Sequence, residues 1–141
     1  MGIFTGMRIS ASGLHAERTR MDVISGNIAN VETTRGPNGG PSRRRQVVLG
    51  AWQSAEGSAA RNAGGYHGVR VVGVEEAGGA LTSVYNPGHP DADAEGYVLM
   101  PDVELPTEMA DMMIAARAYE ANAAAFRAGR DIIRQALSIL A

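Results

Sequence analysis

The sequence predicts a mainly α protein with a small β insert, in which long N- and C-terminal helices pair as a coiled coil. Apolar residues recur every seven positions near the C-terminus, and a shorter pattern of the same spacing lies near the N-terminus. The segment between them is rich in Gly and Pro and contains short Val-rich runs. The expected organisation is a helix over 1–31, a small β-rich region over 32–104 and a coiled-coil helix over 105–141.

The C-terminal segment has the clearest helical pattern. One heptad series consists of Met112, Tyr119, Phe126, Ile133 and Leu140, and a second, four residues later each time, consists of Ala116, Ala123, Arg130 and Leu137. Ala, the strongest helix former, fills most of the remaining positions. Pro106 and Thr107 favour a helix start there. A single helix of this length would extend about 50 Å, so its apolar stripe requires a partner helix.

The N-terminal segment supplies a candidate partner. Its spaced apolar residues are Leu14, Met21, Ile24, Ile28 and Val31. Glycines interrupt this helix and each costs about 1 kcal/mol relative to Ala, so we expect it to order only when it packs. Asn27 and Asn30 lie near its end. Each either caps the helix or fixes the register between helices through its side chain, and Asn30 suits a left-handed C-terminal stop.

The middle region contains four short runs that predict strands, near 47–49, 69–74, 81–85 and 97–100. The stretch from about 51 to 65 is small and polar, and we expect it to be a flexible loop.

The composition excludes several kinds of chemistry. All 13 basic residues are Arg, so no Lys can form a Schiff base or bind phosphate in a P-loop, and no Cys is present. The net charge of −2 provides no basic field for nucleic acid. No apolar run reaches the length of a signal peptide core or a membrane span. We therefore expect no catalysis by Lys or Cys, no membrane insertion and no cleaved signal peptide.

The stretch NPGHPDADAEGY, residues 86–97, is the most chemically suggestive loop. Asp91, Asp93 and Glu95 alternate as in a calcium-binding loop. The neighbouring prolines prevent the flanking helices of such a site, and His89 has no second histidine nearby in the sequence for a transition metal. A shaped turn is the simpler interpretation, and a calcium-dependent binding module is the alternative.

The two ends of the chain resemble a known family. RMDVISGNIANVETT, residues 20–34, resembles the N-terminal motif of flagellar rod, hook and hook-associated axial proteins, with Asn27 to Asn30 and then Thr33 at its centre. RAYEANAAAFRAGRDIIRQAL, residues 117–137, resembles the closing helix of the same family. The segments 68–74, 84–98 and 109–122 are similar to its proximal-rod members. Gly26 and Ser42 depart from the usual pattern, in which larger and aromatic residues stand there.

This resemblance implies a structural subunit of the bacterial flagellar basal-body rod, the drive shaft that transmits torque in cell motility. It implies no enzymatic activity and no cofactor. It implies a rod location across the periplasm and export by the flagellar type III apparatus. The implied partners are neighbouring proximal and distal rod subunits and base components of the basal body. It also implies terminal helices that are largely disordered before assembly.

The residues expected to carry assembly lie on both helices. They are Leu14, Met21, Ile24, Asn27, Ile28 and Asn30 on the N-terminal helix, and Met112, Ala116, Tyr119, Ala123, Phe126, Ile133, Leu137 and Leu140 on the C-terminal helix. Besides the calcium module, the alternatives are a sibling rod or hook protein and a small secreted helical chaperone or adaptor.

Overall fold

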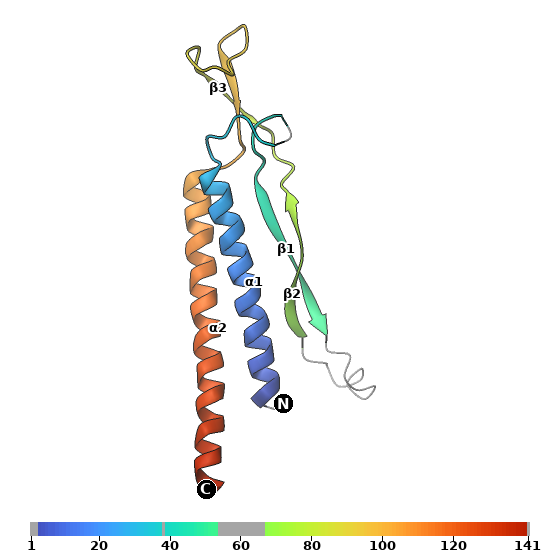
Figure 1. The fold of residues 1–141 in the computed structure, drawn as a ribbon, viewed down its shortest axis with the longest axis vertical. Helices are drawn as coiled ribbons and strands as arrows, with labels where there is room; N and C mark the ends of the chain where they lie inside the picture. Colours follow the sequence, from blue (N-terminus) through green and yellow to red (C-terminus); the bar gives the residue numbers. More distant parts are fainter. Residues whose placement is uncertain (1–2, 38, 54–66, 141) are drawn as a thin grey trace.

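The computed structural model describes residues 3–37, 39–53 and 67–140, and it confirms a mainly helical chain with a small β region (Figure 1). Helix α1 spans Ile3–Ala29 and helix α2 spans Leu105–Leu140. The two helices lie side by side and run in opposite directions, with the chain termini near the same end (Figure 1). Neither helix contains a stretch long and apolar enough to span a bilayer.

Helix α2 begins at the predicted boundary, next to the proline that favours a helix start. Leu105 is its first residue, so Pro106 and Thr107 lie within the first turn. Proline is tolerated there because the first N–H groups of a helix have no partner inside the helix. Glu108 adds a carboxylate in the same turn, where the helix dipole favours negative charge.

Helix α1 does not end in the left-handed stop predicted for Asn30. Among the described residues, no residue other than glycine has a positive φ. The Asn30 N–H instead approaches the carbonyl oxygens of Gly26 at 3.2 Å and Asn27 at 3.1 Å, and the Asn30 Nδ2 donates to Gly26 O at 2.8 Å. The last turn therefore tightens and the side chain satisfies a terminal carbonyl, which removes the need for a left-handed residue.

The four predicted strands are present, arranged as two separate antiparallel pairs. Strand β1, Arg45–Gln53, pairs with β2, His67–Glu76, with a register irregularity between Val48 and Leu49. Strand β3, Thr82–Tyr85, pairs with β4, Tyr97–Met100.

The predicted flexible loop begins later than its composition suggests. Residues 51–53 belong to β1 and pair with residues 67–69 of β2, so the prediction is wrong for these three positions. Backbone pairing with β2 holds this segment even though Ala51 and Gln53 are not typical strand residues. The remainder of the expected loop, 54–65, lies outside the described residues.

Helix α1 is the central element of the molecule. Its backbone lies close to α2, β1 and β2, whereas the backbone of α2 lies close to neither strand of the β1–β2 hairpin. The hairpin therefore lies along α1 rather than along the helix pair as a whole (Figure 1). Gly68 permits close approach to α1, since a Cβ atom there would lie 2.8 Å from Ser12 Oγ, and this hydroxyl accepts the Val69 N–H at 3.1 Å.

Candidate functional site: the helix pair and the polar hub

The centre of the contact between α1 and α2 is a column of small and polar residues. On α2 this column comprises Glu108, Ala115, Asn122 and Gly129, spaced by seven. Glu108 and Ala115 are fully buried. Asn122 lies against Gly13, and Gly129 lies against Met7, so close that a Cβ atom on either glycine would approach the facing side chain to 2.8 Å.

The residues expected to carry assembly flank this column. Ile24 and Asn27 are buried in the described structure. Ten others are half-buried, namely Leu14, Met21, Ile28, Asn30, Met112, Ala116, Tyr119, Ala123, Phe126 and Ile133. Leu137 is 62% exposed, and the side chain of Leu140 lies outside the described part of the molecule.

The heptad spacing was recognisable from the sequence, but the residues at its centre were not. Each member of the central column precedes a member of the Met112 series by four positions, so both series follow one period. The spacing of large apolar residues predicts the flanking series but not the central positions of Glu108, Ala115 and Gly13. Small residues occupy the centre because they allow the two backbones to approach closely. Arg130, assigned to the second series, is exposed and lies 3.3 Å from Asp131 Oδ1.

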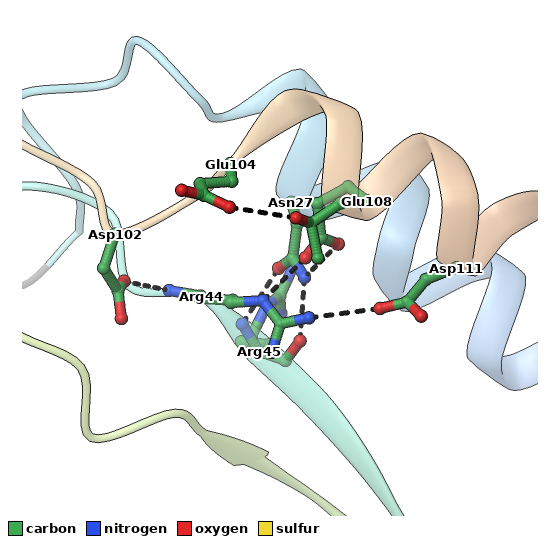
Figure 2. Close-up of polar contacts among 8 residues, drawn as sticks. Asn27, Arg44, Arg45, Asp102, Glu104, Glu108 and Asp111 are labelled. Carbon is green, nitrogen blue, oxygen red and sulfur yellow. Dashed lines mark hydrogen bonds and ion pairs between the residues drawn. The ribbon is translucent and has the colours of Figure 1, made fainter.

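Four side chains form a polar hub where α1, α2 and the start of β1 meet; we define the hub as Asn27, Arg44, Glu108 and Asp111 (Figure 2). Glu108 Oε1 accepts from Arg44 Nε at 2.6 Å, and Glu108 Oε2 accepts from Asn27 Nδ2 at 2.9 Å. Arg44 Nη2 also lies 3.4 Å from Asp111 Oδ2. Each oxygen of a fully buried carboxylate thus has a donor, which is what a stable buried charge requires.

Asn27 also joins α1 to the first residue of β1. Its Oδ1 accepts the Arg45 N–H at 2.9 Å, and its Nδ2 donates to the Arg45 carbonyl at 2.8 Å. The side-chain amide thereby pairs with both backbone groups of Arg45, as a residue of a neighbouring strand would. Asn27 therefore links α1 to the start of β1 and, through Glu108, to α2, whereas the Asn30 side chain binds a terminal carbonyl of its own helix.

The hub extends to the segment that leads into α2. Asp102 lies three residues before the first residue of α2, and its Oδ1 accepts the Arg44 N–H at 3.1 Å. Arg44 therefore contacts the approach to α2 through its backbone and α2 itself through its guanidinium (Figure 2).

The loop at 86–97 is fastened to the segment that follows α1. Asp91 Oδ2 accepts from the Thr34 hydroxyl at 2.7 Å, and Asp91 Oδ1 accepts from Arg35 Nε at 2.6 Å. The Thr34 hydroxyl, followed by Arg35, lowers the pKa of Asp91 below its usual value, and these contacts outweigh the opposing effect of desolvation. Asp91 is thus a structural anchor.

The remaining acids of this loop do not converge on a cation position. Asp93 Oδ1 accepts the backbone N–H groups of Glu95 at 2.9 Å and Tyr97 at 2.8 Å, which closes the turn between β3 and β4. Within the described residues, no group of three or more His, Cys, Asp or Glu side chains is placed to hold a metal ion. The calcium-like spacing is therefore used for a hydrogen-bonded turn.

Comparison with known proteins matches both ends of the chain to one family. The flagella basal body rod protein family model matches residues 7–37, which include most of α1 and its exit. The model for the C-terminal region of flagellar basal body rod FlgEFG proteins matches residues 94–139, which include nearly all of α2.

Full-length relatives agree with these matches. The chain is 41% identical over 150 residues to flagellar basal-body rod protein FlgC of Borreliella burgdorferi and 40% identical to that of Bacillus subtilis, covering 99% of both chains in each case. It is 35% identical to FlgC of Escherichia coli O6:H1, covering 99% of this chain and 98% of the relative. The chain therefore belongs to the FlgC family of flagellar basal-body rod proteins.

Proposed function

We propose that this protein is a structural, non-enzymatic subunit of the proximal part of the flagellar basal-body rod, and that its terminal helices carry its self-assembly. Membership of the FlgC family supports this function. The observation in the structure that supports it best is that α1 leaves apolar side chains of α2 exposed.

The surface of α2 that faces away from α1 carries large apolar residues. Met109, Met113 and Ile114 are each more than half exposed near its beginning, and Ile139 is 83% exposed near its end. Exposed apolar side chains that group together, as these three do near the start of α2, mark protein contacts rather than a solvated helix face. A single copy of the chain does not cover it, because α2 packs against α1 and against no other described helix or strand.

Contacts between α2 of one subunit and the helices of another would be heterologous and need not close into a small ring. Such contacts suit a tubular rod. We propose neighbouring proximal and distal rod subunits and base components of the basal body as partners. Delivery would use the flagellar type III export apparatus, without a cleaved signal peptide.

The proposed organisation assigns assembly to 1–31 and 105–141 and subunit-specific shape to 32–104. The helix residues expected to carry assembly, including Met112, Phe126 and Leu137, would contribute either to the pairing of α1 with α2 or to contacts with neighbours. No catalytic role is proposed, because the buried polar groups of the hub are occupied by one another.

Two substitutions test the proposal at different surfaces. Phe126→Asp places a charge in the half-buried flank of the helix pair, and Met113→Asp places one on the outward face of α2, where Met113 is 64% exposed. In a strain lacking the native gene, both variants should be exported but should fail to restore rods and swimming. Phe126→Leu, which keeps an apolar side chain, is the matched control and should restore swimming.

Circular dichroism separates folding from assembly. Met113→Asp should keep the helical content of the unmodified chain, since its side chain is largely in water already. Normal swimming of both aspartate variants would contradict the proposal.

A further inference from the structure

We propose that a groove beside the β3–β4 hairpin receives the exposed face of strand β2 from a second copy of the same chain. The residues of β2 that enter the groove are Arg70 and Val72. This inference rests on the rod function proposed above and names one pair of surfaces through which copies of the chain meet.

The groove lies between the segment that follows α1 and the β3–β4 hairpin, and its volume is about 580 Å³. Pro37 and Pro41 line one side, and Asp93, Tyr97 and Leu99 line the other. Tyr97 is 44% exposed and Leu99 is 53% exposed, so a single chain leaves both side chains accessible. A cavity of this size lies in the range of sites that bury a ligand.

Local contacts hold the two sides of the groove together. Asp91 of the hairpin accepts hydrogen bonds from the Thr34 hydroxyl and the Arg35 guanidinium. The Gly36 N–H donates to the Gly40 carbonyl at 2.6 Å, which closes the turn on the other side. These contacts join residues outside α1 and α2, so the groove does not depend on the pairing of the terminal helices. A site that is already formed binds a partner at a smaller cost in conformational entropy.

The matching surface lies on β2. Val72 is 61% exposed, more than any other large apolar side chain described in the β1–β2 hairpin. A Cβ atom on Gly50 would lie 2.7 Å from Val72 Cγ2 and 4.0 Å from Arg70 Nε, so Val72 and Arg70 share the face on which Gly50 lies. This face therefore presents an apolar side chain beside an exposed positive charge.

Charge favours contact between the two surfaces. Arg70 forms no ion pair or hydrogen bond with the described residues. The other described arginines of residues 32–104 have contacts within the chain, which are Arg35 with Asp91, Arg43 with the Gly79 carbonyl, Arg44 with the polar hub and Arg45 with Gly26. Asp93 and Glu95 are exposed, and neither forms an ion pair within the described part of the chain. Opposite charges on two surfaces orient their association.

One copy of the chain does not bring the two surfaces together. No Cα atom of β2 lies within 8 Å of a Cα atom of β3 or β4. Strand β3 lies beyond the end of the helix pair, whereas β2 runs alongside α1 (Figure 1). The occupant of the groove therefore comes from another molecule. A contact between two different surfaces of identical chains is heterologous, so each added copy leaves a groove and a β2 face open for the next.

Cysteine cross-linking in assembled basal bodies tests this contact. The chain has no cysteine, so Val72→Cys together with Leu99→Cys introduces its only two thiols. A disulfide needs Cα atoms within about 7 Å, and β2 and β4 of one chain do not approach that closely, so the bond forms only between copies. The variant replaces the native protein in a motile strain, and isolated basal bodies are oxidised and separated without reductant. We expect dimers and higher multiples of the chain that reductant converts to monomers.

Val74→Cys together with Leu99→Cys is the matched control. Val74 is also an exposed valine of β2, but it pairs with Val47, whereas Arg70 pairs with Gly50. Positions 47 and 50 are an odd number of residues apart on β1, so Val74 lies on the opposite face of the hairpin from Arg70. The control should give at least about tenfold less cross-linked chain than the test variant. Chains with Val72→Cys or Leu99→Cys alone should stay monomeric, because a heterologous contact does not place either residue against its own copy.

Charge reversal supplies a second test that needs no cysteine. Arg70→Glu should reduce the number of rods about tenfold, because it places a carboxylate against the acids beside the groove. Glu95→Arg should have the same effect, because it places a second arginine against Arg70. The double variant with both changes should restore rods. Glu95 is the better position for reversal, because Asp93 Oδ1 also closes the turn between β3 and β4.

The outcomes separate this contact from the rod function. Absence of the unmodified chain from isolated basal bodies would overturn both proposals. Rods that contain the test variant without disulfides between copies would overturn the contact and leave the rod function standing. Normal rods in both single charge reversals would do the same. Disulfides that join the chain to a different protein would show that another partner fills the groove, and they too would overturn the contact.

Discussion

Gly13 of α1 lies directly against the side chain of Asn122 of α2. A Cβ atom on Gly13 would come within 2.8 Å of Asn122 Oδ1 and 2.9 Å of Asn122 Cγ. The amide is held in place because Asn122 Nδ2 donates to the Ala118 carbonyl at 2.9 Å. A glycine that weakens α1 as an isolated helix therefore allows α1 and α2 to pack closely.

This relationship predicts that Gly13→Ala does not give the usual stability gain of a Gly-to-Ala change in a helix. That gain is about 1 kcal/mol, and displacing the Asn122 amide should cancel or exceed it. Gly6→Ala is the control, because no atom lies within 4 Å of the added methyl group and the full gain is expected. Urea unfolding of both variants measures the difference. Equal gains in stability at the two positions would show that the Asn122 side chain moves aside without cost.

The hub predicts which of two substitutions at position 27 destabilises the chain more. Asn27→Ala should destabilise the chain by about 2 kcal/mol, because the Arg45 backbone and Glu108 lose hydrogen-bond partners. Asn27→Asp, although similar in shape, should cost more, because an acceptor would replace the donor that faces Glu108 Oε2 and the Arg45 carbonyl. The change in unfolding free energy measured by urea titration checks this order. A milder effect of Asp than of Ala would contradict the assigned orientation of the amide.

Two glycines with positive φ are predicted to differ in how much an alanine substitution destabilises the chain. Gly96 and Gly39 both have positive φ, at 86° and 80°. A Cβ atom on Gly96 would also lie 2.9 Å from Tyr85 Cε2 and 3.2 Å from Pro87 Cβ, whereas nothing lies within 4 Å of one on Gly39. Gly39→Ala should therefore cost about 1 kcal/mol from backbone strain alone, and Gly96→Ala should cost more. Thermal unfolding compares them, and equal losses would indicate that the ring of Tyr85 moves aside freely.

The lowered pKa of Asp91 predicts a specific dependence of stability on acidity. Because the folded-state pKa lies below the unfolded value of about 3.9, the stabilisation is complete above that pH and is lost as the pH falls through the folded-state pKa. Asp91→Asn should be less stable at neutral pH, and its deficit should shrink as the solution is acidified below about pH 4. Melting temperatures from pH 7 to pH 2.5 measure this difference. Glu95→Gln, in the same exposed loop, serves as the control, and a deficit that stays constant with pH would contradict the role assigned to Asp91.

The sequence supported the types and order of the elements because those depend on local patterns. The heptad series through Phe126, the Ala-rich composition and the position of Pro106 are sufficient to predict α2. The Val-rich runs predicted the strands. Segment 51–53 was misassigned because its strand conformation depends on pairing with β2 rather than on its own composition.

The candidate site was predicted less completely. Heptad spacing identified the face of α2 that meets α1, but several residues share that face, and spacing alone does not show which of them lie at its centre. Asn27 was singled out with two interpretations, but its contacts with Arg45 and Glu108 became apparent only in the structure. Arg44 and Glu108 gave no sign of their pairing, because 64 positions separate them along the chain.

By itself, the sequence determined that one long helix precedes a small β region and another follows it. It also determined that the two helices share a seven-residue period that requires them to pair, since periodicity and helix propensity are local properties. Tertiary structure alone decided that small residues such as Gly13 and Ala115 form the centre of the pair. It alone brought Glu108 to Arg44 and Asn27, because burial and hydrogen-bond partners depend on how distant segments meet in space.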